Sequence, residues 1–169
     1  MSASADPQLS AGWVSGVGGE GDADSLWRET TWFNALRAEL VLGRDRSADL
    51  GLGPYLELGT SGFSDVRLGS GVVGVLPLSE ALPLTLGAGA TARRDDGRWT
   101  PGFSASAMLG SRSYNFHATY AIATGLVLAY QRDLDAAGAS TVIVALQLDG
   151  LLLAMPVIFG ISAVRGSSE

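Results

Sequence analysis

Residues 82–131 alternate between large apolar and small side chains, and this period of two constrains the fold of the chain more than any other feature. Because successive side chains leave a strand on opposite faces, the alternation predicts three consecutive β-strands. The turn signal Asp95-Asp96-Gly97 separates the first two strands. The large residues of one face include Leu84, Leu86, Trp99, Phe103, Tyr114, Phe116, Leu126 and Leu128. The opposite face is rich in Gly, Ser and Thr, and is therefore small and weakly polar.

This small face indicates the interior of a narrow barrel and not a surface in water. A soluble antiparallel sheet normally solvates its outer face with charged side chains. Here all 11 basic residues are Arg, and most charges fall in predicted turns or near the N-terminus, so no strand face remains for that purpose. The hydrophobic fraction of 47 % and the mean hydropathy of +0.25 agree with large side chains that face hydrocarbon. The pattern therefore predicts a small transmembrane β-barrel.

The same alternation extends along the chain and predicts eight strands in total. They are expected over residues 8–18, 30–43, 50–60, 66–78 and 140–149, together with the three strands within 82–131. Eight is an even number, and it is the smallest strand count of outer-membrane barrels. Strands of roughly ten residues also suit a tilted crossing of a bilayer. We predict an all-β, eight-stranded, antiparallel, up-and-down transmembrane β-barrel.

A chain of 169 residues is expected to form one domain. We divide it into a flexible N-terminus over 1–7, the barrel over 8–149 and a C-terminal segment over 150–169. An even strand count places both termini on one side, conventionally the periplasmic one, so 18–29, the longest predicted loop, becomes the first external loop. Another loop is expected over 132–139. No signal peptide is visible at the start of the chain, and we expect it to have been removed.

The apolar stretch 151–164 does not follow the barrel pattern. It lacks alternation and contains Pro156, which cannot donate a hydrogen bond to a neighbouring strand. It is also too short for a helix that spans a bilayer. Asp149-Gly150 suits a hairpin turn into a further strand. Alternatively, Pro156 begins a short helix that packs against the barrel end, and this second interpretation is favoured.

A set of charged and aromatic residues falls on the predicted inner face. It comprises Arg37, Glu39, Tyr55, Glu57 and Arg67. Short turns between the strands place Arg37 opposite Glu57, and Glu57 opposite Arg67. Because buried charges persist only when they are paired, we predict a ladder of alternating sign that plugs the lumen and sets the register. A gated ion path is the alternative, but eight strands leave an interior that side chains just fill.

Three aromatic residues are expected at the loop ends of their strands, on the lipid-facing side. They are Trp32, Trp99 and Tyr130. Aromatic side chains at the two membrane interfaces form girdles around transmembrane barrels. We predict that these three residues form part of such a girdle.

His117 is the only histidine, and its parity places it on the lumen face as a hydrogen-bonded interior residue. His117-Ala118-Thr119 also resembles the His-x-Ser element of the outer-membrane lipid A 3-O-deacylases, which are eight-stranded barrels with a Ser-His-Glu triad. The resemblance implies a lipid-modifying hydrolase in which His117 is the base and Thr119 the nucleophile. This chain has Thr119 where the family has Ser.

Over most of residues 9–149, the pattern resembles the small eight-stranded outer-membrane barrels typified by OmpA and OmpX. The resemblance implies a porin-like fold in the outer membrane of a Gram-negative bacterium. It also implies contact with lipopolysaccharide or phospholipid, and we expect a monomer. That class usually ends in a strand with a C-terminal aromatic, whereas this chain ends Arg165-Gly166-Ser167-Ser168-Glu169.

Composition narrows the function further. The net charge of −6 disfavours a nucleic-acid partner, and the absence of Cys excludes disulfides and thiolate metal sites. We expect no metal and no cofactor. The favoured hypothesis is an integral outer-membrane barrel with a side-chain-filled lumen, in a structural or surface-interaction role and not as an enzyme. The alternatives are the lipid-modifying hydrolase, a soluble lipocalin-like carrier of an apolar ligand and a narrow channel.

Overall fold

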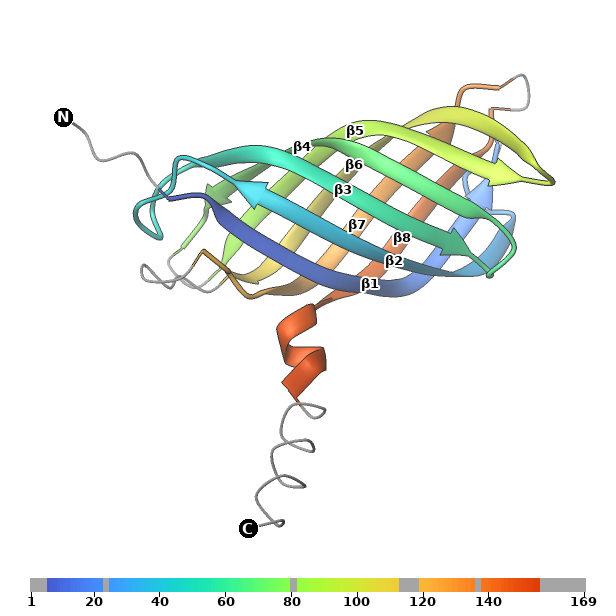
Figure 1. The fold of residues 1–169 in the computed structure, drawn as a ribbon. Coiled ribbons are helices and arrows are strands. Elements are labelled where there is room, and N and C mark those ends of the chain that lie inside the picture. The colour runs from blue at the N-terminus through green and yellow to red at the C-terminus, as the bar shows by residue number, and fades with distance from the viewer. Residues whose placement is uncertain (1–5, 23–24, 80–81, 113–118, 136–137, 156–169) are drawn as a thin grey trace, which may run out of the picture.

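Eight antiparallel strands follow one another around a closed barrel, and the last strand pairs with the first (Figure 1). The strands are β1 (Gln8–Gly21), β2 (Glu29–Val41), β3 (Gly51–Ser61), β4 (Val66–Pro77), β5 (Pro83–Asp95), β6 (Arg98–Arg112), β7 (Ala123–Asp133) and β8 (Ser140–Asp149). This computed structural model describes residues 6–22, 25–79, 82–112, 119–135 and 138–155. The predicted fold class, an eight-stranded up-and-down barrel, is confirmed.

The predicted turn between β5 and β6 shows how local sequence sets the register. Asp95 pairs with Arg98, so the loop contains only Asp96 and Gly97. Both loop residues have a positive φ, at 46° and 81°. Two consecutive positive φ values define the hairpin turn that matches the twist of the flanking strands, and Asp-Gly is a preferred sequence for it.

Two predicted boundaries are wrong. β1 continues to Gly21, so the loop predicted over 18–29 shrinks to 22–28 and is not the longest. The longest connection lies between β6 and β7, over 113–122, where the alternation predicted a strand from Tyr114 onward. Residues 113–118 lie outside the described residues. The side-chain pattern did not predict these boundaries for two reasons. A Gly-rich stretch can form part of a strand as well as a turn, and an apolar stretch can belong to a connection between strands as well as to a strand.

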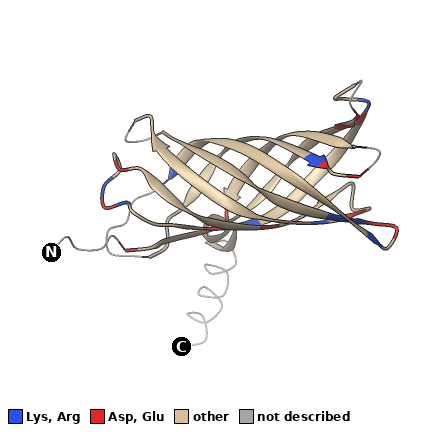
Figure 2. Cartoon of the chain, turned by 90° about the horizontal axis from the view of Figure 1, so that it is seen from above, with Lys and Arg blue, Asp and Glu red and all other residues tan. Residues whose placement is uncertain are grey.

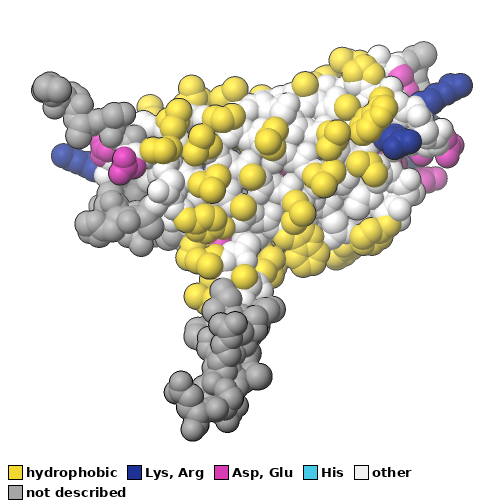
Figure 3. All heavy atoms as spheres, in the orientation of Figure 1, with side chains coloured by type: hydrophobic (Ala, Val, Ile, Leu, Met, Phe, Trp, Pro, Cys, Tyr) yellow, Lys and Arg dark blue, Asp and Glu magenta, His cyan; other side chains and the backbone are white. Residues whose placement is uncertain are grey.

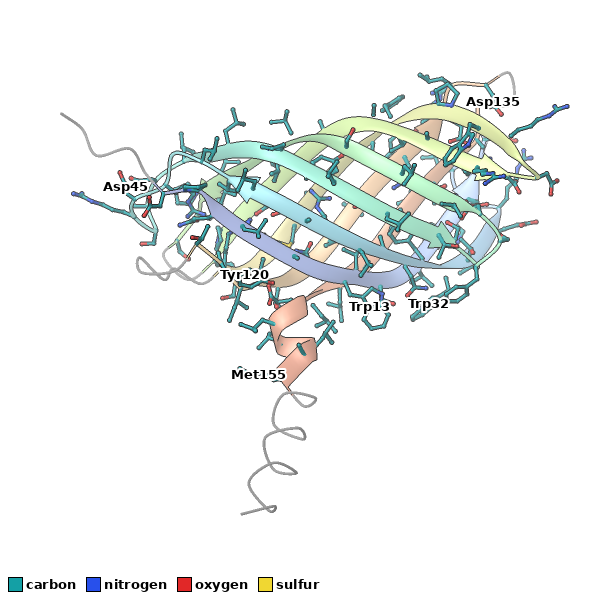
Figure 4. The ribbon with its side chains drawn as sticks, viewed as in Figure 1. Trp13, Trp32, Asp45, Tyr120, Asp135 and Met155 are labelled. Carbon is teal, nitrogen blue, oxygen red and sulfur yellow. The ribbon has the colours of Figure 1, made fainter. Side chains whose placement is uncertain are left out.

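The connections at the two ends of the barrel also differ from the expectation of short inner turns and long outer loops. Residues 42–50, 78–82 and 113–122 connect the strands at the N-terminal end. At the opposite end the connections are 22–28, 62–65, 96–97 and 134–139, and none of them is longer than 113–122. Asp45 and Asp135 mark the two ends in Figure 4.

Large apolar side chains cover the outside of the barrel wall. Leu86, Phe103 and Leu126 expose between 41 % and 53 % of their surface. Most charged residues lie toward the two ends, and on the outer surface hydrophobic side chains occupy the band between them (Figures 2 and 3). A lipocalin-like carrier would need these large residues to line the interior, so their outward orientation excludes that alternative.

The interior is less uniformly small and polar than the alternation predicted. A buried apolar cluster occupies part of the lumen: Val14, Phe33, Ala35, Met108, Ala123, Val127, Ile143 and Ala145. A second cluster contains Val41, Tyr55, Val73 and Val75. Apolar side chains fill a narrow lumen without needing hydrogen-bond partners, whereas every buried polar group needs one.

A segment of the β6–β7 connection continues the pairing of β1 where β8 ends. Asp149 lies opposite Gly12, so β8 stops before it reaches the start of β1. Residues 119–121, from the β6–β7 connection, pair with the exposed edge of β1: Leu9 N–H donates to the Thr119 carbonyl at 2.7 Å, and Ala121 N–H donates to the Leu9 carbonyl at 2.8 Å. The backbone N–H and carbonyl of Leu9 are therefore hydrogen-bonded although β8 does not extend this far.

The Tyr120 hydroxyl completes this seam. It accepts a hydrogen bond from Ala11 N–H at 3.3 Å, and its proton lies within reach of the Ala11 carbonyl at 2.9 Å. The carboxylate oxygens of Asp149 lie 3.1 and 3.2 Å from the same hydroxyl. Asp149 also accepts from Ala123 N–H and Leu151 N–H. One side chain from the connection thus replaces the missing strand partner of Ala11.

A short helix over residues 150–155 follows β8 directly. The Leu151 N–H bond to Asp149 caps its N-terminus, which fits the preference for Asp at this position. The helix begins six residues before Pro156, and Asp149-Gly150 does not form a hairpin turn into a ninth strand. It leaves the wall sideways, with Tyr120 beside its start and Met155 at its far end (Figures 1 and 4). No helix in the described part of the chain is long and apolar enough to cross a membrane.

Tyr120→Phe tests the seam. The variant keeps the ring but leaves the Ala11 backbone groups without this partner, so we expect the free energy of unfolding to fall by about 1–3 kcal/mol. Denaturant unfolding of the barrel in lipid vesicles measures the change. Tyr130→Phe is the matched control, since its hydroxyl contacts no described residue through a hydrogen bond and its loss should have little effect. Equal losses in the two variants would contradict the role of Tyr120.

Candidate functional site in the barrel lumen

Three arginines from alternate strands reach into the lumen. Arg37 lies on β2, Arg67 on β4 and Arg112 on β6, and all three are buried. Strands on opposite sides of a narrow barrel face each other across the lumen, so long side chains can meet partners that are distant in sequence. We call the three arginines and their partners the lumen charge network.

Arg37 is the centre of this network. Its Nε donates to Glu39 at 2.9 Å, and its Nη1 lies 3.4 Å from Glu57. Nη1 also donates to the Ser106 hydroxyl of β6 at 3.3 Å. The guanidinium carbon lies 4.2 Å from the centre of the Tyr55 ring, a distance suited to a cation–π contact. Arg37 is thereby held from three strands at once.

Arg112 extends the network toward the N-terminal end of the barrel. Its Nη1 donates to Glu39 at 2.9 Å, and its Nη2 donates to the Ser10 hydroxyl at 2.7 Å. Glu39 therefore lies between Arg37 and Arg112, with one oxygen bonded to each. A buried carboxylate between two guanidinium groups has its charge compensated from both sides.

Arg67 organises the opposite end of the lumen. Its Nε donates to Asp65 at 2.7 Å and its Nη2 to Glu20 at 2.7 Å. Its Nη1 crosses to Gln131 on β7 at 2.8 Å and to Thr141 on β8 at 3.2 Å. The amide of Gln131 lies 3.5 Å from Glu57, so it links Arg67 to the centre of the network.

Two glycines on β5 provide the space for the central residues. A Cβ on Gly87 would lie 2.9 Å from Nη2 of Arg37 and 2.6 Å from the Ser106 hydroxyl. A Cβ on Gly89 would lie 2.7 Å from the Tyr55 hydroxyl, which itself bonds to Ser104 at 3.0 Å. The inward-facing residues of β5 are therefore small because they leave space for the long side chains of Arg37 on β2 and Tyr55 on β3.

The predicted register is confirmed at one rung and wrong at the next. Arg37 lies opposite Glu57, as the short β2–β3 turn predicted. Arg67 lies opposite Gly59, and Glu57 lies opposite Gly69, so the predicted Glu57–Arg67 rung does not form. The paired strands are centred on residue 63, within the turn over 62–65, whereas a Glu57–Arg67 pair requires a centre at residue 62, so the predicted rung was two residues out of register.

Sequence reasoning missed several members of the network. Arg112 has the inward parity of Ser104 and Ser106, but the predicted strand ended at Gly110. Glu20 has the inward parity of Ser10, but it was assigned to a loop. If the two predicted strands had been extended to their observed ends, Arg112 and Glu20 would have been assigned to the inner face. Gln131 carried no such signal, because its role depends on which strands meet across the barrel.

The predicted girdle residues lie near the end of the barrel opposite the N-terminus. Trp32 and Trp99 are about half exposed, near the starts of β2 and β6. Tyr130 lies near the end of β7, and its ring centre is 6.1 Å from that of Phe103. Trp32 projects from the wall in Figure 4.

The residues of the hydrolase hypothesis are only partly described. His117, the predicted base, lies outside the described residues. Thr119 is exposed, and its carbonyl oxygen closes the wall against Leu9. The structure therefore brings no catalytic pair together within the described residues.

No protein-family model and no curated protein matches the chain. Among solved structures, a de novo designed transmembrane β-barrel is similar, with a TM-score of 0.47 and 15 % identity over 87 % of this chain and 99 % of the designed one. The outer membrane protein Ail of Yersinia pestis, in a phospholipid bilayer nanodisc, has a TM-score of 0.45 and 11 % identity over 84 % of this chain and 99 % of its own. At these identities neither likeness says anything about the role of the chain.

Glu39→Gln tests the lumen charge network. The amide keeps the size of the side chain but leaves Arg37 and Arg112 without their shared negative charge, so we expect the free energy of unfolding to fall by about 3–5 kcal/mol. Denaturant unfolding of the folded barrel measures it. Glu29→Gln is the same change at the exposed start of the same strand, where an effect below about 0.5 kcal/mol is expected. A small effect at Glu39 would show that the network is not tightly coupled.

Proposed function

We propose that the protein is an integral barrel of the bacterial outer membrane whose lumen is closed by side chains, and that its role is structural or one of surface interaction. The observation that carries this proposal is the lumen charge network. Arg37, Arg67 and Arg112 each bond to groups on more than one other strand. Side chains tied across the lumen at successive levels leave no room for an open aqueous path.

The space left inside the barrel agrees with a closed lumen. A cavity of about 10 Å³ lies between Arg37, Glu57, Gln131 and the apolar cluster. Such a cavity holds about one water molecule. An eight-stranded barrel is expected to have an interior that its own side chains just fill, in contrast to the channels of wider porins. We therefore propose the plug and not the gated ion path.

The outer surface supports placement in a membrane. Every described strand pairs on both edges, so the wall presents no unpaired ladder to hydrocarbon. The apolar band lies between charged ends (Figure 3). Closed antiparallel barrels with an even strand number and such a band belong to outer membranes. The lipid contacted is proposed to be lipopolysaccharide or phospholipid, and we expect a monomer because the sheet closes on itself.

The aromatic residues refine this placement. Trp32, Trp99 and Tyr130 are proposed to lie at the headgroup level of one leaflet, since amphipathic rings favour that depth. Arg94 lies with its guanidinium carbon 6.0 Å from the Trp99 ring centre. A charged residue beside the ring fits the boundary between hydrocarbon and water.

Two measurements on the purified protein test the closed lumen. Folded in detergent, unboiled protein is expected to migrate differently from boiled protein on a denaturing gel. In planar bilayers the same sample is expected to give no stepwise conductance, because the network blocks the lumen. A wide porin in the same bilayer is the positive control. Stable single-channel openings from the wild-type chain would overturn the plug.

Leu128→Arg tests the membrane placement. Leu128 lies at the middle of β7 and exposes 55 % of its surface, so a charge there should lower the free energy of unfolding in vesicles by about 2–4 kcal/mol. Leu134→Arg, beyond the end of the same strand, is the control, with an expected loss of about 0–1 kcal/mol. Similar small losses at both positions would contradict burial of this face in hydrocarbon.

A further inference from the structure

The helix over 150–155 leaves the barrel from inside the apolar band and not from its rim. Asp149 lies opposite Gly12, whereas the outward-facing Leu9 lies three residues nearer the end of the barrel. At about 3.3 Å per residue and a tilt of about 40°, this separation is about 8 Å along the barrel axis. Leu42 and Leu50 extend the exposed apolar surface at the same end. The helix therefore begins at a level where the wall still faces hydrocarbon.

Where the helix leaves the wall, the backbone polar groups are hydrogen-bonded within the protein, as an environment without water requires. In hydrocarbon every backbone polar group needs a partner within the protein. The edge of β1 that β8 abandons is paired by residues 119–121 and by the Tyr120 hydroxyl. The first turn of the helix is capped by Asp149, which is fully buried and is itself bonded to Tyr120 and Ala123. A departure into water would not require these replacements.

The helix is apolar on all sides. Leu151, Leu152, Leu153 and Met155 each expose about 40 % of their surface, and Ala154 lies between them. The sequence continues without a charged residue until Arg165. A helix that lies on a membrane surface normally has a charged or polar face toward water. This helix has none, so its surroundings must be apolar.

A furrow on the outer wall lies beside the start of the helix. It has a volume of about 750 Å³ and begins at Gly150 and Leu153. Small outward-facing residues form its floor on β1, β2, β4 and β5: Ala11, Ala38, Ser70 and Ala90. The exposed side chains of Leu36, Leu56 and Leu58 also line it, so the furrow is continuous with the apolar outer face of the barrel. In a bilayer, the molecules that cover this face are lipids.

We propose that residues 150–155 form a membrane-embedded arm that lies among the acyl chains of the leaflet on the N-terminal side of the barrel, with phospholipid acyl chains filling the furrow on the wall beside it. This inference rests on the proposed membrane placement. The arm adds lipid contact outside the barrel wall and resists movement of the barrel along the membrane normal. Its direction away from the wall is visible in Figure 1.

Single-cysteine probes test the arm, because the chain contains no Cys of its own. Leu153→Cys places a probe on the arm, Leu128→Cys on the barrel wall and Asp96→Cys in the β5–β6 turn. Each variant carries a polarity-sensitive fluorophore and is reconstituted in phosphatidylcholine vesicles with or without bromine on the acyl chains. A heat-dependent gel shift shows that each labelled variant is folded.

We expect bromine to quench the probes at Leu153 and Leu128 to a similar extent, and several-fold more than the probe at Asp96. Aqueous iodide should show the reverse order. If the Leu128 probe is quenched by bromine and the Leu153 probe responds only to iodide, the arm lies in water and the inference fails while the membrane placement stands. If neither is quenched by bromine, the membrane placement itself fails.

A second copy of the chain is the other partner that an exposed apolar arm can take. Oxidative cross-linking of unlabelled Leu153→Cys protein in the same vesicles tests it, with Leu128→Cys as the control. Monomeric protein at a high lipid ratio agrees with an arm in lipid. Efficient disulfide-linked dimers through Leu153, together with weak bromine quenching, would show that the arm packs against another copy and would overturn the proposal.

Discussion

The structure depends on the pairing of backbone hydrogen-bonding groups at every edge of the sheet. A strand edge that faces hydrocarbon has no water to bond to, so a barrel in a membrane must close completely. Here closure is achieved by β1 and β8 over most of their length, and by residues 119–121 where β8 has left the wall. The hydroxyl of Tyr120 completes the same ladder with a side chain. A strand can therefore end early without opening the wall.

Closure of a small barrel creates a second constraint, because the lumen must be filled. The protein fills it with an apolar cluster and with the lumen charge network. Buried ion pairs add little net stability compared with apolar packing, but each partner is indispensable once the other is present. Glu39 between Arg37 and Arg112 illustrates this interdependence. The network thus favours one register and one closed lumen over alternatives, and this fits a barrel that is not a channel.

Much of this architecture was predictable from local pattern. The alternation along β5 and β6 and the Asp96-Gly97 turn depend on neighbours in sequence, and both were read correctly. Errors arose where pattern and pairing diverge. The Gly-rich end of β1 looked like a loop but is paired with β2. Residues 119–121 looked like part of a strand of the barrel, but Tyr120 instead forms an isolated parallel bridge with Leu9 of β1, beyond the point where β8 ends. Glycine and short apolar stretches occur both in strands and in connections. Which of the two forms is decided by whether a neighbouring strand is there to pair with the stretch.

The sequence by itself determined that the chain forms eight strands and which face of each strand turns outward, because a period of two and the size of the side chains are properties of each strand alone. It also placed Arg37 opposite Glu57, since a short turn sets the register of adjacent strands. Only the tertiary structure decided that Arg67 meets Gln131 and Thr141, and that β8 gives way to a capped helix at Asp149. The contacts of Arg67 join strands that are not adjacent in sequence, and the point at which β8 ends is fixed by its pairing with β1, so both depend on the tilt and stagger with which the whole sheet closes.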